Sequence, residues 1–316
     1  MKKVVLFVLL LGLIAVFELR KWTVESGPLS DSVSVIIPKG AGSAVVTQKL
    51  VESGVIQHPF WFRVLGRVNG WDKNIKAGEY AFEPKVSLLD VWKNLLEGKV
   101  LYRRITFAEG LTSKQFLDLI AQEDMLMGEI TEDVKEGELL PETYNFTYGD
   151  SKNSIVLRAK KAMQNVLAEA WAHRDVSLPL KSADELLILA SIVEKETGIA
   201  SERPLVASVF ANRLRKGMRL QTDPSVIYAL TLGQYELERS LTRKDLMVDS
   251  PYNTYKYFGL PPTPICNPGR DALMAAARPE ISDWLYFVAS GDGGHNFAKS
   301  LREHNKNVKI WRQRGL

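Results

Sequence analysis

The most constraining feature of this chain is an apolar segment in its second half. If this segment forms a helix, the helix has no polar face. Positions 186–192 carry only Leu, Ile, Ala and Ser. A helix that is apolar on every side has to be covered by other elements, so this segment predicts a helix buried in the core of a mixed domain. Ser182, with Glu185 three positions later, forms the capping-box pattern that starts such a helix.

Two carboxylates stand in the last turn of this helix. Glu194 continues the face of Leu187 and Ser191, whereas Glu196 continues the face of Leu189. A carboxyl group at the edge of an apolar core is partly desolvated, which raises its pKa and keeps it protonated near neutral pH, as a general acid requires. The pattern does not choose between the two carboxylates. It also fits a solvated glutamate at a helix end.

Composition limits the kinds of site that this chain can carry. Its 316 residues are enough for two domains. The net charge of +4 comes from scattered residues without a run of five Lys or Arg, which argues against a nucleic-acid partner. The four histidines include no His-x-x-x-His pair, so we expect no metal site and no cofactor. The one cysteine, Cys266, is expected to be a buried apolar side chain.

The chain begins with an apolar run that indicates a membrane anchor. Two lysines precede fourteen apolar residues at 4–17, which span about 21 Å as a helix against the ~30 Å of a bilayer core. The run reaches Trp22 if the charged side chains before it extend towards the interface. No small-residue cleavage pattern follows closely. We therefore expect an uncleaved anchor at 1–22, with residues 23–316 outside.

The next part of the chain predicts a small mixed module. Residues 23–31 are polar, contain a Gly-Pro pair and are expected to be a linker. The patterns that follow predict a strand at 33–37, a helix at 43–53, a helix that begins at Pro59, and a strand at 78–82. This strand–helix–helix–strand (βααβ) order resembles the LysM-type module that holds N-acetylglucosamine polymers. A helix capped by Ser87 and running to Leu96, a strand at 101–107 and a helix at 154–173 are also predicted.

A strand-to-helix turn recurs at an offset of seventy residues. Ile37-Pro-Lys-Gly40-x-x-Ser43 matches Phe107-Ala-Glu-Gly110-x-x-Ser113. In each copy a strand ends, a glycine makes a tight turn, and a helix begins with a serine that we expect to cap it. The sequence leaves two explanations open: an internal duplication, or the ordinary chemistry of such a turn.

The residues around the two carboxylates match a known pattern. Ala190-Ser-Ile-Val-Glu-Lys-Glu-Thr197 resembles the signature helix of the endolytic murein transglycosylase family, the MltG or YceG-like proteins. The resemblance covers roughly residues 30–310. It continues through Val206–Leu214, Met218–Tyr228, Tyr252–Tyr255, Gly259–Pro262, Asn267–Gly269, Tyr286–Val288, Gly294–Phe297 and His304–Asn305. The departures from the family pattern are Glu138, Leu140, Glu142 and Thr263, which concern loop packing.

The resemblance implies a fold, an organisation and a location. The fold is α+β: a LysM-like βααβ module joined to a mixed α/β catalytic domain that contains the buried helix. The anchor would occupy 1–22, the linker and module 23–105, and the catalytic domain 106–316. The chain would be a single-pass inner-membrane protein with its catalytic domain in the periplasm. It would act on peptidoglycan glycan strands near the synthases that extrude them.

The resemblance also selects Glu194, the first acid of Glu-Lys-Glu, as the catalytic carboxyl group. The implied reaction is non-hydrolytic. The carboxyl protonates the oxygen that leaves C1 of N-acetylmuramic acid, and the C6 hydroxyl of that sugar attacks C1 to leave a 1,6-anhydro end. Ordinary glycosidases use two carboxylates. Here the nucleophile is held within the sugar itself, so one is enough.

Five further residues are candidate substrate-binding groups. Sugar sites need amides and hydroxyls for the ring hydroxyls, with aromatic faces beside them. The residues that meet this description on loop-like segments are Gln221, Thr222, Asn253, Tyr255 and His295. Turn chemistry is the alternative for several of them, because Asn and an Asp-Pro pair are common turn formers.

Two other functions remain open at this point. A non-catalytic, membrane-anchored peptidoglycan-binding scaffold of the cell-wall synthesis machinery would use the same anchor and module. A glycoside hydrolase with two carboxylates would leave reducing ends rather than anhydro ends.

Overall fold

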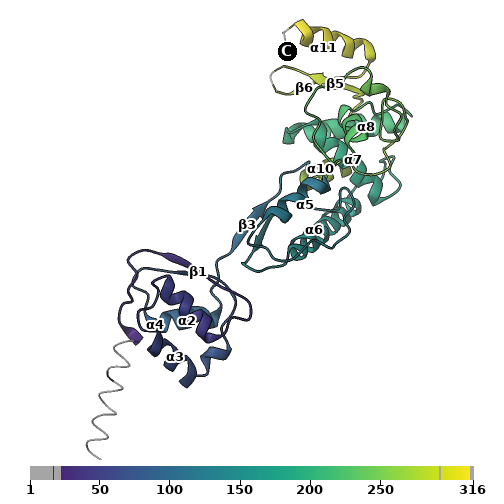
Figure 1. Cartoon of the computed structure of the whole chain (residues 1–316). Helices are drawn as coiled ribbons and strands as arrows, with labels where there is room; N and C mark the ends of the chain where they lie inside the picture. Colours follow the sequence, from purple (N-terminus) through teal and green to yellow (C-terminus); the bar gives the residue numbers. More distant parts are fainter. Residues whose placement is uncertain (1–16, 18–22, 292, 314–316) are drawn as a thin grey trace, which may run out of the picture. The chain divides into compact units, whose positions relative to one another are not determined.

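The computed structural model describes residue 17 and residues 23–291 and 293–313. The expected anchor at 1–22 therefore lies outside the described residues, except for residue 17. Within the described part, no helix has the length and hydropathy needed to cross a membrane. The chain divides into two compact units. Among the described residues, the first unit comprises those up to 104 with 124–127 and 145–151, and the second unit comprises the others (Figure 1).

The first unit contains the expected strand–helix–helix–strand order. Its elements are β1 (Val33–Ile37), α2 (Ser43–Glu52), α3 (Pro59–Val68), a 3-10 turn (Trp71–Lys73), β2 (Gly78–Phe82) and α4 (Leu88–Glu97). Strands β1 and β2 pair antiparallel, with Val33 opposite Phe82. The core forms around Trp92, whose ring stacks on Phe62 at 4.3 Å between centroids and whose Nε1 donates to the Phe62 carbonyl oxygen at 3.1 Å.

The starts of these helices correct part of the sequence analysis. Ser87 caps α4 as expected, because its side chain accepts a hydrogen bond from the Asp90 amide. The expected cap at Ser43 is wrong: Gly42 is the N-cap of α2, no side chain caps it, and Ser43 is the first helical residue. A serine inside the first turn is one position too late for its oxygen to serve the free amides.

The repeated turn has the same backbone form in both units. Gly40 and Gly110 each have a φ of +78°, a conformation that side chains rarely adopt. In the second copy the cap is again one residue earlier than expected. Thr112 caps α5 (Ser113–Gln122) and forms a complete capping box with Gln115. The strand before that turn, β3 (Arg103–Thr106), is shorter than the expected 101–107.

The second unit is built around α7 (Ala183–Glu196). Every residue from Leu186 to Val193 is buried, as the apolar sequence predicts. Helix α7 contacts α6 (Lys152–Ala172), α8 (Arg203–Arg215), α9 (Asp223–Thr231) and α10 (Arg270–Ala277). Strand β4 (Thr143–Phe146) has residues in both units. The other elements of the second unit are 3-10 turns (Ala200–Glu202, Asp245–Met247), the antiparallel strands β5 (Tyr286–Ala289) and β6 (His295–Ala298), and α11 (Leu301–Gln313).

The start of α7 follows the expected cap only in part. The Ser182 side chain accepts a hydrogen bond from the Glu185 amide. The Glu185 carboxylate does not return to the Ser182 amide and instead accepts from the Lys181 amide at 2.6 Å. The cap is therefore present, and the glutamate satisfies the preceding peptide group.

Candidate active site

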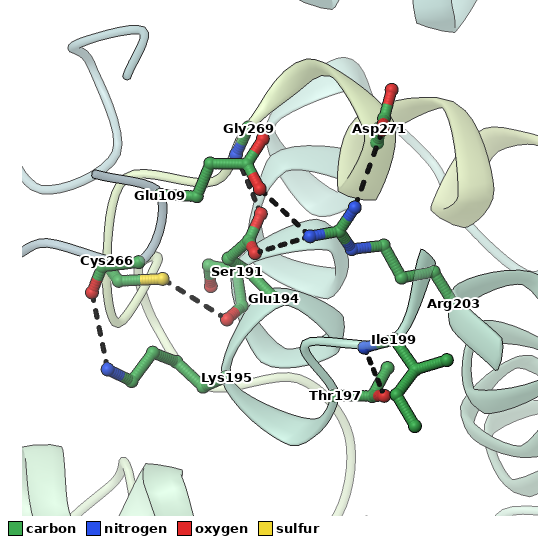
Figure 2. Close-up of polar contacts among 11 residues, drawn as sticks. Glu109, Ser191, Glu194, Lys195, Thr197, Ile199, Arg203, Cys266, Gly269 and Asp271 are labelled. Atoms are coloured by element: carbon green, nitrogen blue, oxygen red, sulfur yellow. Dashed lines mark hydrogen bonds and ion pairs between the residues drawn. The ribbon is translucent and has the colours of Figure 1, made fainter. Parts of the chain in front are cut away.

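The carboxyl group of Glu194 lies in a cluster of charged groups at the end of α7. Its side chain is only 5% exposed. Oε2 accepts a hydrogen bond from the Gly269 amide at 2.8 Å, and Oε1 lies 3.4 Å from Nη2 of Arg203. The same guanidinium group contacts Glu109 at 2.9 Å and Asp271 at 3.5 Å. Figure 2 shows the three carboxylates directed at one arginine.

Segments far apart in the sequence bring this cluster together. Arg203 is the first residue of α8, immediately after the 3-10 turn that follows α7. Gly269 is the N-cap of α10, so its free amide points at the carboxylate from the positive end of that helix. Glu109 comes from the turn of Gly110. A Cβ atom on Gly110 would lie 3.7 Å from Cγ of Glu194, so this turn covers the carboxyl side chain closely.

The electrostatics of the cluster favour a proton on Glu194. Burial raises the pKa of the Glu194 carboxyl group, and the charge of Glu109 acts in the same direction. The Gly269 hydrogen bond and the charge of Arg203 oppose this rise without cancelling it. Three carboxylates around one guanidinium group would carry an excess negative charge if all were ionised, which disfavours the third ionisation. The cluster therefore favours a protonated Glu194. It also stabilises the Glu194 anion, through the Gly269 amide and Arg203.

The other carboxylate of the last turn, Glu196, lies at a separate cavity. This cavity of about 350 Å³ is lined by Glu196, Phe210, Arg213, Leu220, Gln221, Asp223, Tyr255, Tyr286, Phe287, Leu301 and His304. Burial raises the pKa of Glu196 to about 7, and the charge of Asp223 adds to the rise. Both carboxylates that the sequence left as alternatives are therefore desolvated, in different surroundings.

Four of the expected substrate-binding residues lie near Glu196 rather than at the Glu194 cluster. Gln221 and Tyr255 line its cavity, and Gln221 holds a left-handed φ of +50°. Strained backbone of this kind is often found at functional sites. Thr222 is 1% exposed and its hydroxyl lies beside the Glu196 carboxyl group. His295 lies close enough to Glu196 to lower the pKa of that carboxyl group electrostatically.

Two of the expected residues have strong partners within the protein. The His295 ring nitrogen Nδ1 lies 2.6 Å from the Glu202 carboxylate, and its backbone amide donates to the same carboxylate at 2.9 Å. Asn253 is completely buried. Its amide nitrogen donates to the carbonyl oxygens of Leu246 and Val248, and its oxygen accepts from the Tyr255 amide. In this conformation Asn253 stabilises the loop through these hydrogen bonds. This is the turn-forming role that the sequence analysis gave as the alternative to sugar binding.

A second cavity adjoins the Glu194 cluster on the side of Glu109 and Lys195. It measures about 460 Å³ and is lined by Glu109, Gly110, Leu111, Thr112, Gln115, Lys195, Pro224, Ile227, Tyr228, Thr231, Tyr235, Glu236, Leu237 and Ile265. Lys195 Nζ donates to the Gly110 carbonyl oxygen at 3.3 Å. Three consecutive residues at the end of α7 therefore lie at three places. Glu194 lies in the charged cluster, Lys195 lines one cavity and Glu196 lines the other.

Comparison with known proteins identifies the family. The YceG-like family model matches residues 35–310. This chain belongs to the YceG-like family. The endolytic murein transglycosylase of Bacillus subtilis (strain 168) is 33% identical, over 87% of this chain and 83% of the relative. That of Streptococcus pneumoniae serotype 2 is 28% identical, over 87% of this chain and 58% of the longer relative. The crystal structure of a YceG-like protein from Listeria monocytogenes superposes with a TM-score of 0.54 at 34% identity, covering 87% of this chain and 99% of that one.

Sequence reasoning missed three members of the Glu194 cluster in this YceG-like chain. Arg203 and Asp271 each follow one oppositely charged residue, and Glu109 is the charged residue before Gly110, so no local pattern marks any of the three. Only the fold brings them to Glu194. The one available signal was the Asn-Pro-Gly segment that ends at Gly269, since a glycine before a helix often leaves its amide free for an anion.

Metal and thiol chemistry gain no support in this YceG-like chain. Among residues 23–291 and 293–313, no group of His, Cys, Asp or Glu is arranged to hold a metal ion. Cys266 is buried, as expected, and its thiol donates to the Ser191 carbonyl oxygen at 3.3 Å. Burial raises the pKa of this thiol well above its usual range, so it is not a poised nucleophile.

Proposed function

We propose that Glu194 is the acid and base of an endolytic murein transglycosylase that cleaves the bond between N-acetylmuramic acid and N-acetylglucosamine. The relatives named endolytic murein transglycosylase match most of this chain. The observation that carries the assignment is the setting of Glu194: a carboxyl group 5% exposed, with a raised pKa, beside Arg203 and the Gly269 amide.

The reaction uses this one carboxyl group twice. Protonated Glu194 gives its proton to the glycosidic oxygen as the C1–O bond of N-acetylmuramic acid breaks. The resulting carboxylate is held by the Gly269 amide and the Arg203 guanidinium group. It then takes the proton of the C6 hydroxyl of the same sugar, whose oxygen closes on C1. Glu194 is protonated again, and the products are a 1,6-anhydro end and a new free hydroxyl group.

The first unit and the N-terminus complete the proposal. The βααβ order of the first unit supports a LysM-like role, in which it holds the N-acetylglucosamine-containing strand. Residues 1–22 would anchor the chain in the inner membrane and leave the catalytic unit in the periplasm, near the synthases that supply nascent strands. These assignments rest on the sequence pattern and on the family resemblance.

Digestion of purified peptidoglycan by the full chain in detergent tests the activity. Mass spectrometry should find 1,6-anhydro-muramyl ends. Glu194→Gln keeps the shape of the side chain but has no acidic proton to donate, so the rate should fall at least ~100-fold, within the range for losing a general acid. Asp184→Asn, at an exposed position in the first turn of the same helix, is the matched control and should retain full activity.

The products separate this proposal from its competitors. Reducing ends in place of anhydro ends would assign a two-carboxylate hydrolase. Binding of strands by a folded protein without any cleavage would assign the non-catalytic scaffold. Wild-type activity in Glu194→Gln would remove Glu194 from the chemistry.

A further inference from the structure

Part of the segment that the sequence marks as a linker is packed against the first unit. The Gly27 amide donates to the Lys85 carbonyl oxygen at 3.1 Å, and the Lys85 amide donates to the Leu29 carbonyl oxygen at 3.0 Å. Leu29 packs against the core of the unit. A Cβ atom on Gly27 would overlap the Val86 carbonyl oxygen, so the two backbones approach as closely as a glycine allows. This stretch is therefore fixed to the unit rather than a free tether.

The same segment enters the unit beside the start of α3. A cavity of about 220 Å³ is lined by residues 25–28 and by residues 55–58, among others, and α3 begins at Pro59. Only three residues lead from position 22, the proposed end of the anchor, to position 25, and they span at most about 11 Å. A tether of this length is about one Debye length in physiological salt. The proposed anchor therefore keeps the start of α3 close to the region in which charged lipids attract basic side chains.

Helix α3 presents a row of apolar side chains to solvent. Phe62 and Gly66 are buried, which leaves Phe60, Val64 and Val68 on the opposite side of the helix at intervals of four residues. Phe60 is 65% exposed and Val68 is 80% exposed. Single exposed apolar residues are common, whereas a contiguous row of them marks a surface that another molecule covers.

Two arginines flank this row. Arg63 and Arg67 lie one turn apart and line a hollow of about 480 Å³ that Phe60 and Val64 also line. In the part of the chain that the structure describes, neither arginine makes a side-chain hydrogen bond or an ion pair. Asp72 is the one carboxylate among the residues that line the hollow. The face therefore carries a net positive charge next to its apolar row.

We propose that the outer face of α3, formed by Phe60, Arg63, Val64, Arg67 and Val68, docks on the anionic phospholipid surface of the membrane in which the chain is anchored. A helix of this composition buries its apolar side chains among the lipid headgroups and sets its basic ones against anionic lipid. Guanidinium groups bind phosphate oxygens in a bidentate geometry. A lipid surface is favoured over a soluble partner because the chain arrives from the membrane beside the start of this helix. The proposal rests on the proposed anchor and adds a second membrane contact to it.

A spin label on α3 measures the docking directly. Cys266 is completely buried, so in a Val68→Cys variant the introduced thiol takes the label and the native one does not. The full labelled chain is reconstituted in vesicles of phosphatidylcholine with one third phosphatidylglycerol. The label should become accessible to oxygen and shielded from a water-soluble nickel complex. A label in Leu89→Cys, at an exposed position of α4, should stay in water. A label at position 68 that also stays in water would overturn the proposal.

Charge variants test the role of the two arginines. Arg63→Gln combined with Arg67→Gln should lower the ratio of docked to undocked label about thirtyfold, because each basic side chain near an anionic surface contributes about a factor of five. Lys93→Gln combined with Lys99→Gln removes the same charge from another exposed part of the first unit and should leave the ratio unchanged. Vesicles of phosphatidylcholine alone should reproduce the loss in the parent chain. Equal losses in the two double variants would assign the effect to net charge and overturn the face.

A third variant tests the apolar row at little risk to folding. Phe60 is mostly exposed, so Phe60→Ser should leave the melting temperature unchanged while docking weakens about tenfold, as expected for partial burial of one aromatic side chain. Unchanged docking in this variant would contradict the proposal. Shielding of the position 68 label by soluble peptidoglycan strands, but not by anionic lipid, would assign the face to glycan instead.

Flotation of the vesicles separates the docking from the anchor. In strong salt the docked face should release, because the attraction between arginines and lipid is screened, while the anchor keeps the chain on the vesicles. A chain that floats with anionic vesicles in strong salt, but whose label stays in water at low salt, overturns the docking alone. A chain whose label is shielded at low salt, but that leaves the vesicles in strong salt, overturns the anchor alone.

Discussion

The Glu194 carboxylate receives the backbone amide of Gly269 at 2.8 Å, so the acid of α7 meets the N-terminus of α10. This contact stabilises the anion that remains after Glu194 has given up its proton. Burial acts the other way and keeps the proton in place beforehand. The balance between the two suits the proposed role of this carboxyl group, which acts as an acid and then as a base within one turnover.

The pH dependence of activity should report the proton on Glu194. The pKa of this group is raised and the acid form is the reactive one, so kcat/KM should fall as the pH rises through that pKa. Arg203→Gln removes the cation that favours the anion, which should move this alkaline limb to higher pH. The pH profiles of the wild type and of Arg203→Gln are obtained from initial rates of anhydro-end formation across pH 5–9. A limb that moves to lower pH would contradict the arrangement.

The same substitution should destabilise the second unit. Arg203 is 8% exposed in its side chain and balances three carboxylates, so Arg203→Gln should cost about 3 kcal/mol of unfolding free energy. Arg270→Gln breaks an exposed ion pair with Glu169 and should cost less than about 1 kcal/mol. Urea unfolding followed by circular dichroism compares the two. Equal losses would show that Arg203 does not hold the cluster together.

Gly269 should tolerate a side chain only if Glu109 moves. A Cβ atom at position 269 would overlap the carboxylate of Glu109, while the backbone of Gly269, at a φ of −73°, is open to any residue. Gly269→Ala should therefore lower the melting temperature in the wild-type background and have little effect in a Glu109→Ala background. Calorimetry of the four proteins gives the coupling between the sites. Additive losses would place the strain elsewhere.

Glu196 should make the second unit less stable as the pH rises. A carboxyl group whose folded pKa is about 7 binds its proton more tightly in the folded than in the unfolded chain, where the value is 4.5. The free energy of unfolding should therefore fall between about pH 4.5 and 7, by up to about 3 kcal/mol. Glu196→Gln lacks this dependence. Its melting temperature should match the wild type near pH 4.5 and exceed it at pH 8, and a difference that is constant with pH would refute the assignment.

Substitution of Asn253 should lower the free energy of unfolding more than it weakens substrate binding. Its side chain holds two carbonyl oxygens and one amide of the loop that carries Tyr255. Asn253→Asp loses both donated bonds and should cost about 2–3 kcal/mol. Gln221→Ala, at the exposed neighbour of the Glu196 cavity, should instead weaken substrate binding with little change in melting temperature. A stable Asn253→Asp protein with a raised KM would restore the direct sugar contact expected from the sequence.

The sequence was most informative where one local pattern decides the structure. The apolar residues of α7 and the βααβ order of the first unit follow from periodicity, and Ser87 caps its helix as written. Ser43 misled because a serine one residue inside a helix looks the same as a cap in the sequence. Strand and helix existence are therefore more predictable than their first residues.

The site was less accessible because its chemistry is made by distant segments. Periodicity could not choose between Glu194 and Glu196, and the structure explains why: both are desolvated, one by a charged cluster and one by an aromatic cavity. Nothing local marks Arg203 as the common partner of three acids. Only the fold shows that two of the candidate sugar-binding residues, Gln221 and Tyr255, line the cavity of the second carboxyl group rather than the cluster of the first.

The burial of α7 along eight consecutive residues also limits how this protein can evolve. Side chains two residues apart on a helix point about 200° away from each other. Glu194 therefore points to the charged cluster and Glu196 to the cavity on the other side of the helix. Inserting or deleting one residue ahead of them would rotate the terminal turn by about 100° and misdirect both acids together. Changes of specificity are therefore expected through substitutions in the cavity walls, while the length between Ser182 and Glu194 stays fixed.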